Sequence, residues 1–172
     1  GCQTLLIPMV ERAEQAQALV QAMHYPPRGV RGVGAALARA SQYGGRSDYL
    51  RTADDEVCLL LQVESQKGLD ALDEILKVDG VDGVFIGPAD LAADMGYLGN
   101  PTAEPVVKAV EEALIKIKAA GQKAGILTSD PNLLRRADEI GAEFIAIGSD
   151  VGLLRVAAAQ ALNSFKTMTQ SK

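Results

Sequence analysis

Two acidic residues follow neighbouring apolar segments of this 172-residue chain. Glu64 comes directly after the run Val57–Val63, and Asp90 follows the next apolar run, Gly83–Ile86, after a short turn. If both runs are parallel β-strands, both carboxylates lie at the carboxyl-terminal edge of one sheet, where α/β proteins bind ligands. A hard divalent cation such as Mg²⁺ commonly takes one or two protein carboxylates and keeps water and substrate oxygens in its other positions. The pair predicts a metal site, while spacing alone equally allows Glu64 to cap a helix and Asp90 to be a solvated acid.

The turn Gly87-Pro88-Ala89-Asp90 suggests a second function at the same place. Glycine lets a ligand approach the backbone closely, and the N–H groups of Ala89 and Asp90 at the start of a helical turn suit a carboxylate. A metal beside such donors fits a 2-oxo acid, whereas a tight turn that only packs its proline is equally open. A Schiff-base mechanism is disfavoured, because no expected strand offers a lysine near this edge and Lys123 lies at the opposite end of its strand.

Five strands that alternate with helices are expected to position these residues. Short apolar runs without alternation are typical of parallel strands covered by helices. The runs are Thr4–Val10, Val57–Val63, Gly83–Ile86, Ala124–Leu127 and Phe144–Ile147. Between them apolar residues recur at helical spacing, as at 13–23, 69–76 and 106–117. Asp130-Pro131 predicts a helix start and Gly121 a helix end, so the order of elements predicts an α/β fold with a parallel sheet.

Five βα units leave two architectures open. They allow either an open doubly wound sheet or part of a (β/α)₈ barrel, which needs about 250 residues when complete. The lack of a glycine-rich dinucleotide fingerprint after the first strand disfavours the Rossmann version. No linker or low-complexity tract divides the sequence, so residues 1–172 are expected to form a single domain. The last helix is expected from about Gly152 to Phe165, followed by a polar, frayed tail over Thr167–Lys172.

Composition argues against several classes of function. The formal net charge is −5 and no basic patch with interleaved aromatics occurs, so nucleic acid is not an expected partner. The apolar runs are too short to span a bilayer, and no leader pattern is expected at the amino terminus. Cys2 and Cys58 are expected to be buried, which predicts a cytoplasmic protein. His24, the only histidine, is expected at the surface or at a cap, and the acidic segment 78–83 is expected to be a turn.

Four segments together resemble the HpcH/HpaI aldolase family. They are Gln3–Val10, His24–Gly34, Gln62–Ser65 and Gly80–Leu91. The resemblance covers essentially the whole chain and implies a (β/α)₈ barrel of the pyruvate aldolase type, of which about the last five βα units are present. It implies reversible cleavage of a 4-hydroxy-2-oxo acid, such as 4-hydroxy-2-oxoheptanedioate, to pyruvate and an aldehyde.

The resemblance also implies roles for individual residues. Glu64 and Asp90 match the family's metal ligands, and the metal is typically Mg²⁺, Mn²⁺ or Co²⁺. Pyruvate chelates that metal, which polarises the keto carbonyl for carbon–carbon cleavage. Gln62 would support the site from beside the metal, and the backbone of the turn 87–90 would hold the pyruvate carboxylate.

The sequence departs from the family's pattern in two motifs that it lacks. The family carries an Asp-Gly-Glu-His motif, whose His serves as or assists the base, and a Val-Arg-Pro-like motif, whose Arg contacts the keto oxygen. Neither occurs here, so no catalytic base is identified, and both groups are expected in about three missing amino-terminal βα units. Ala35 also occupies a position where the family often has a Ser, which would contact the distal end of the substrate. The isolated chain is therefore expected to be inactive or strongly impaired.

Two other functions stay open. A citrate-lyase-like C–C lyase would share the barrel and the two carboxylates, but it needs a coenzyme A site, for which no basic cluster is present. A non-catalytic metal-binding remnant would need a partner that covers the exposed sheet edge. The resemblance further implies a homo-oligomer, a hexamer with exchanged carboxyl-terminal helices, in which the helix Val151–Phe165 would be the exchanged element.

Overall fold

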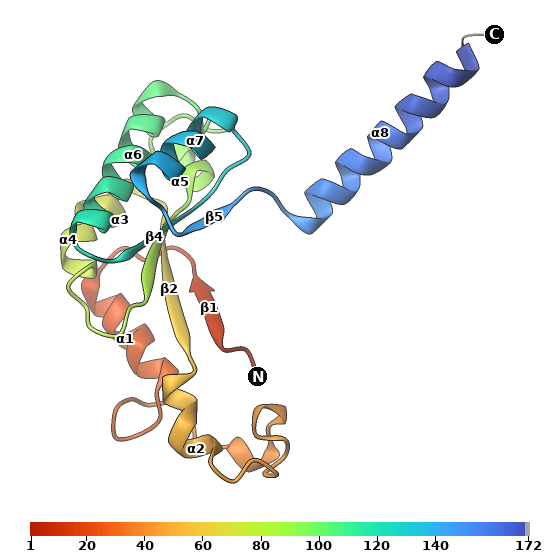
Figure 1. The fold of residues 1–172 in the computed structure, drawn as a ribbon. Coiled ribbons are helices and arrows are strands. Elements are labelled where there is room, and N and C mark those ends of the chain that lie inside the picture. Colours follow the sequence, from red (N-terminus) through yellow and green to blue (C-terminus); the bar gives the residue numbers. More distant parts are fainter. Residues whose placement is uncertain (171–172) are drawn as a thin grey trace.

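Five parallel strands form one continuous sheet in sequence order (Figure 1). The computed structural model describes residues 1–170. The strands are β1 (Thr4–Ile7), β2 (Cys58–Val63), β3 (Gly83–Ile86), β4 (Lys123–Leu127) and β5 (Phe144–Ala146). The predicted α/β class with a parallel sheet is confirmed. β1 ends three residues earlier than expected, because Pro8 lacks an N–H for the sheet and Met9 has a left-handed backbone with φ 56°.

Helices join the strands. They are α1 (Ala13–Met23), α2 (Tyr49–Thr52), α3 (Gln66–Asp70), α4 (Leu72–Ile75), α5 (Pro88–Asp94), α6 (Glu104–Ala119), α7 (Pro131–Ile140) and α8 (Asp150–Gln170). Helices α1, α6 and α7 contact strands of the sheet, whereas α8 projects away from it (Figure 1). The one helix expected over 69–76 is instead split between α3 and α4, and α8 begins before Gly152 and continues through the expected tail as far as Gln170. Residues 171–172 of that tail lie outside the described residues.

The two faces of the sheet differ in burial. In β2, the side chains of Leu59, Leu61 and Val63 are at most 2% exposed and belong to the core shared with the helices. The alternate residues of β2 are only half-buried, and Phe144 of β5 is 46% exposed. The sheet curls, so its helix-covered face is convex and its other face forms the inside of a half-barrel (Figure 1).

A glycine in β4 allows two aromatic rings to meet inside this half-barrel. The rings of Phe85 and Phe144 pack edge to face with their centroids 5.2 Å apart. Gly125 pairs with both residues in the neighbouring strands, and a Cβ at Gly125 would overlap the Phe85 ring. The packing of the two rings therefore requires a glycine at position 125 of β4.

Local sequence signals set the ends of two helices as expected. The carboxylate of Asp130 accepts hydrogen bonds from the N–H groups of Asn132 and Leu133 at 3.1 and 2.9 Å, and Pro131 opens α7. Gly121 follows α6 with φ 77°. No helix in residues 1–170 combines the length and apolar character needed to cross a membrane.

Two predictions about single residues were wrong. Cys2 is exposed, because it precedes β1 at the open edge of the sheet, and Cys58 is only partly buried, because it faces the inside of the half-barrel. His24, which was expected at the surface or at a helix cap, is the cap residue of α1 and is 9% exposed. It follows α1, and its Nδ1 lies 2.8 Å from the carbonyl oxygen of Val20, so the capping position was correct.

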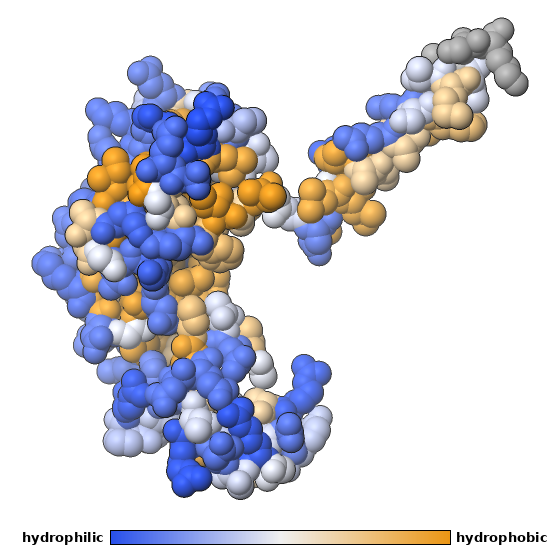
Figure 2. Space-filling view, in the orientation of Figure 1, coloured by the Kyte–Doolittle hydropathy of each residue, from blue (hydrophilic) through white to orange (hydrophobic). Residues whose placement is uncertain are grey.

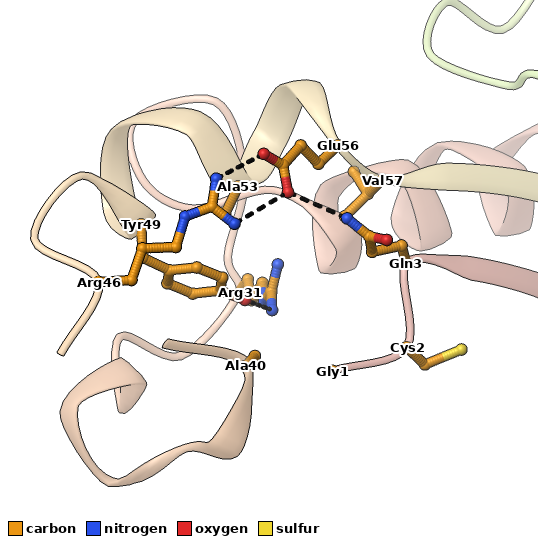
Figure 3. Close-up of a pocket in the computed structure, with 10 residues that line it drawn as sticks. All are labelled: Gly1, Cys2, Gln3, Arg31, Ala40, Arg46, Tyr49, Ala53, Glu56 and Val57. Carbon is orange, nitrogen blue, oxygen red and sulfur yellow. Dashed lines mark hydrogen bonds and ion pairs between the residues drawn. The ribbon is translucent and has the colours of Figure 1, made fainter. Parts of the chain in front are cut away.

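The irregular segment between α1 and β2 packs at the amino-terminal end of the strands. The Arg46 guanidinium forms an ion pair with Glu56 at 2.6 Å, and the Gln3 side chain donates a hydrogen bond to the same carboxylate at 3.0 Å (Figure 3). A small cavity of about 90 Å³ lies beside this network. The segment is thus attached to the end of the sheet opposite Glu64 and Asp90.

Glu143 should make the stability of the fold depend on pH. Lys118 donates to its carboxylate and the Ala124 N–H donates at 2.9 Å, and together they lower the pKa of Glu143 to about 2. A depressed folded pKa means that the stabilisation is full above the unfolded pKa of about 4.5 and is lost as the pH falls towards 2. We expect Glu143→Gln to lower the free energy of unfolding at pH 7 by at most about 1 kcal/mol, since the side chain is partly solvated. Urea unfolding followed by circular dichroism from pH 7 to pH 2 measures it.

Glu139→Gln is the matched control for this prediction, since Glu139 is exposed and makes only a distant ion pair with Arg136, at 3.8 Å. The difference between Glu143→Gln and the wild type should shrink between pH 5 and pH 2. A difference that stays constant over this range would contradict the prediction.

Candidate functional site

Glu64 is a buried carboxylate at the carboxyl-terminal end of β2, with 3% of its surface exposed. Its Oε1 accepts a hydrogen bond from the Met9 N–H at 2.9 Å, and its Oε2 accepts one from the side-chain amide of Gln62. Glu64 does not cap the following helix. The Ser65 hydroxyl does so, by accepting from the Gly68 N–H at 3.1 Å. The alternative that explained Glu64 as a helix cap is therefore wrong.

Asp90 brings a second carboxyl group to Glu64 from the first turn of α5. Burial raises the pKa of Glu64, and the neighbouring Asp90 raises it further, while the donors from Met9 and Gln62 act in the opposite direction. Within residues 1–170, neither acid forms an ion pair with a basic side chain. Two adjacent acids without a positive partner form an environment that a bound cation would stabilise.

Gly87 allows the side chains of Gln62 and Glu64 to cross the backbone of the next strand. A Cβ at position 87 would overlap Glu64 Oε2 and lie 2.8 Å from the Gln62 side-chain nitrogen. Pro88 is buried at the first position of α5, and Ala89 beside it is exposed. The first N–H groups of a helix have no acceptor within the helix, so those of Ala89 and Asp90 can serve a ligand. The structure thus brings together Gln62, Glu64 and the turn 87–90, as the sequence predicted.

The other acids near this edge already have structural partners. Glu11 accepts from Lys67 and from the Ser65 hydroxyl, both at 3.0 Å, and these contacts lower its pKa. Asp130 caps α7, and Asp94 accepts from the Gln66 N–H at 2.7 Å. Glu64 and Asp90 are accordingly the acids best placed to bind a ligand.

The donor set fits a hard cation with an incomplete protein shell. In the described part of the chain, no group of three or more His, Cys, Asp or Glu side chains could hold a metal ion. Two carboxylates nevertheless match the way Mg²⁺ is bound when substrate oxygens and water complete its coordination. The acidic segment around Asp79 does not compete for this role, because Asp82 accepts from the Leu59 N–H at 2.7 Å and Gly80 forms a turn with φ 89°.

An open cavity of about 600 Å³ adjoins the turn 87–90. Loops that follow β3, β4 and β5 line it with Pro88 and Ala89 and with the hydroxyl side chains of Thr102, Thr128, Ser129 and Ser149. The cavity is large enough for a small organic molecule whose carboxylate lies against the turn. Ala35 is not near it, because Ala35 packs with Tyr25, Tyr49 and Ala53 in the segment at the opposite end of the sheet.

Sequence reasoning missed the contribution of Met9. Its backbone N–H donates to Glu64 from a residue in the left-handed conformation, which glycine or asparagine would have signalled but methionine does not. Gln15, whose side chain bonds to the same turn, was missed as well. No pattern in the sequence pointed to Met9, and Gln15 fits only the general preference for a glutamine near a helix start.

The half-barrel with a carboxylate pair at the carboxyl-terminal strand ends defines an α/β protein with a curled parallel sheet, and proteins of this architecture bind ligands at that edge. Comparison with known proteins agrees. The chain belongs to the HpcH/HpaI aldolase/citrate lyase family, whose family model matches residues 1–157. The resemblance seen in the sequence is confirmed, and the chain is a member of an aldolase family.

Individual relatives support this assignment. The chain is 57% identical over 167 residues to a hydroxypyruvate/pyruvate aldolase of Roseovarius nubinhibens, covering 97% of this chain and 65% of that protein. It is 52% identical over 158 residues to a 4-hydroxy-2-oxo-heptane-1,7-dioate aldolase of Shigella sonnei, covering 92% of this chain and 60% of that protein. A solved HpcH/HpaI aldolase/citrate lyase family protein of Burkholderia cenocepacia superimposes with a TM-score of 0.90 at 38% identity, over 96% of this chain and 66% of that one. The chain therefore spans less than two thirds of the length of these two curated relatives.

Gly87→Ala tests whether the packing of Glu64 depends on a bare backbone at this position. The added methyl group would displace the buried carboxylate and the Gln62 amide, so we expect a loss of about 1–3 kcal/mol in the free energy of unfolding. Urea denaturation measures this loss. Gly34→Ala is the control, since a Cβ there meets nothing within 4 Å and its φ is −100°. Equal effects of the two substitutions would contradict the prediction.

Proposed function

We propose that this chain is the metal- and pyruvate-binding part of a divalent-metal-dependent aldolase. The reaction would be the reversible cleavage of a 4-hydroxy-2-oxo acid to pyruvate and an aldehyde. One observation carries the proposal: a 3% exposed Glu64 carboxylate lies beside Asp90, with no basic partner among the described residues. The names of the two curated relatives support pyruvate or a related 2-oxo acid as the shared half of the substrate.

Each residue of the site has a distinct proposed task. Glu64 and Asp90 hold the metal, and the Gln62 amide fixes the orientation of Glu64 through its hydrogen bond to Oε2. When bound, Mg²⁺, Mn²⁺ or Co²⁺ would polarise the keto carbonyl and stabilise the negative charge that develops on cleavage. The N–H groups of Ala89 and Asp90 would donate hydrogen bonds to the pyruvate carboxylate, and Gly87 and Pro88 shape the turn that presents them.

We further propose that additional βα units close this half-barrel into a (β/α)₈ domain and supply the base His and the Arg. Support comes from the outer strands, since among the described residues β1 pairs only with β2, and β5 only with β4. Leu6 and Leu127 on the inner face are 37% and 46% exposed. Unpaired edges and open apolar surface are costly when they face water. A citrate-lyase-like function has less support, because no Lys or Arg lines the cavity beside the site, where a coenzyme would need one.

Metal binding tests the proposed function directly. We expect the wild-type chain to bind Mn²⁺, and Glu64→Gln or Asp90→Asn to weaken binding by about tenfold or more, because each removes one charged ligand. Electron paramagnetic resonance of free Mn²⁺ measures the affinity, and circular dichroism verifies folding. Asp79→Asn is the matched control, since Asp79 is exposed in a turn outside the site.

An equal loss of affinity in Asp79→Asn, or no Mn²⁺ binding by the folded wild-type chain, would contradict the proposed metal site. Release of pyruvate from 4-hydroxy-2-oxoheptanedioate should be absent or strongly reduced with the chain alone, since the base and the Arg are not among its residues. Rapid release that both substitutions abolish would support the site and refute the need for further strands.

Helix α8 supports a homo-oligomer, which we propose to be the hexamer that the family resemblance implies. The helix extends away from the half-barrel (Figure 1), and Figure 2 shows apolar residues along it. Leu154, Phe165 and Met168 are 72%, 62% and 72% exposed. Side chains of this kind are usually covered in a stable protein, and a second copy of the chain is the proposed cover. The two free cysteines fit the cytoplasmic location that we propose.

Deletion of residues 151–172 should reduce the oligomeric state. We expect the intact chain to elute from a gel-filtration column, with light-scattering detection, at a multiple of 18.1 kDa. The shortened chain should shift towards the monomer because the apolar face of α8 is removed. Replacing only Leu154 and Phe165 by Ser gives a milder version of the same test. A monomeric intact chain would refute the proposal.

A further inference from the structure

The turn between β1 and α1 holds an unusual backbone geometry against Glu64. Met9 has φ 56°, in the left-handed region that residues with a Cβ seldom occupy. In this conformation its N–H points at Glu64 Oε1, at a distance of 2.9 Å. Strain of this kind persists only where surrounding contacts enforce it, and it is concentrated at functional sites.

The side chain of Gln15 supplies such a contact. Its amide nitrogen donates to the carbonyl oxygen of Met9 at 3.2 Å, and its amide oxygen accepts from the Glu11 N–H at 3.1 Å. One side chain from the first turn of α1 therefore joins both ends of the segment Met9–Glu11. Among the described residues, Gln15 is the side chain that donates to the Met9 carbonyl.

The middle and far end of the turn are attached to β2 and to the turn that follows it. Val10 is fully buried, and its N–H donates to the carbonyl oxygen of Gln62 at 3.0 Å. Glu11 accepts from Ser65 and Lys67. The Met9 carbonyl and the Val10 N–H belong to one planar peptide group, so the bond from Val10 to Gln62 and the bond from Gln15 together fix the rotation of that group. Of these two contacts, only the one from Gln15 comes from a side chain, so it is the one that a substitution can remove.

We propose that Gln15 is a positioning residue for the metal site, acting through the Met9 backbone on Glu64. The inference rests on the proposed role of Glu64 as a metal ligand. Without the Gln15 amide, only the Val10 N–H still holds this peptide, and Met9 relaxes towards the extended region, because a left-handed backbone is unfavourable for a residue with a Cβ. The Met9 N–H then turns away from Oε1, and Glu64 loses one of the two donors that orient it. Partners of this kind typically change metal affinity by about 10- to 100-fold.

A purely structural role makes a different prediction. Gln15 is the third residue of α1, and a glutamine at this position can reach back to N–H groups that precede a helix. If that were its whole function, its loss would weaken α1 and lower thermal stability. The metal affinity of the folded protein would stay the same, and a substitution at position 9 would not change that affinity.

The test compares Gln15→Leu with Gln17→Leu, the same substitution at an exposed position of the same helix. The rate of amide hydrogen exchange at Met9 in the metal-free protein measures whether the turn is loosened. The Mn²⁺ affinity measures whether the loosened turn weakens the metal site. We expect faster exchange at Met9 and about tenfold weaker Mn²⁺ binding in Gln15→Leu. Gln17→Leu should match the wild type in both measurements.

The double variant Gln15→Leu with Met9→Gly completes the design. Glycine adopts positive φ without a steric cost, so it should restore most of the Mn²⁺ affinity lost in Gln15→Leu. Unchanged affinity in Gln15→Leu, or a loss that Met9→Gly does not reverse, would overturn the positioning role while leaving the metal site intact. A wild-type chain that binds no Mn²⁺ would instead overturn the metal site, and the role of Gln15 towards it.

Discussion

Glu64 is buried at the carboxyl-terminal edge of the sheet, and no basic side chain within residues 1–170 neutralises it. Its surroundings are organised by that charge. An ionised carboxylate loses much of its hydration when it is buried and is retained only where other groups compensate. The Met9 N–H and the Gln62 amide compensate in part, whereas the carboxyl group of Asp90 adds to the repulsion. A divalent cation held by the two acids would remove this repulsion and would supply the Lewis-acid chemistry of the proposed aldolase reaction.

The parallel register of β2 and β3 is what brings the two acids together. Val63 pairs with Ile86, and the Gly87 N–H continues the ladder by donating to the Val63 carbonyl at 3.2 Å. Glu64 therefore lies beside Gly87, and Asp90 follows within the first turn of α5. Because Glu64 must cross the backbone at position 87, any residue with a Cβ there would displace it. The position of Glu64 therefore depends on the strand register, on Gly87 and on the start of α5 together, and a change in one of them would displace the carboxylate.

The same sheet explains why the site faces an open concave surface. The helix-covered face carries the aliphatic core, including Leu59, Leu61 and Val63, and the helices of this chain bury that face. The inner face carries the Phe85–Phe144 pair and the amide of Gln62. In a complete barrel such residues pack against the side chains of the opposite strands. The proposed completion of the barrel would thus bury the inner face and deliver the groups that act on the substrate.

Much of this protein can be read from the sequence alone, because the signals involved are local. Apolar runs predicted the five strands to within three residues, and the Asp130 cap was placed correctly because a helix start depends on a few adjacent residues. The family, the site residues Glu64 and Asp90 and the turn between the strand and α5 were likewise named from short motifs. The exposure of Cys2 and the division of α3 from α4 were not predicted, because they depend on packing between segments far apart in the chain. The full length of α8 was not predicted either.

The tertiary structure decided how Glu64 is held. The left-handed backbone of Met9 and the two hydrogen bonds of Gln15 have no signature in the sequence, since a methionine and a glutamine are common in ordinary loops and helices. Met9 and Glu64 are 55 residues apart in the sequence. The pairing of β1 with β2 brings the turn that contains Met9 against the Glu64 carboxylate, and only this contact gives Met9 and Gln15 a role. Residue type and spacing determine which groups are available, and long-range strand pairing determines which backbone atoms meet them.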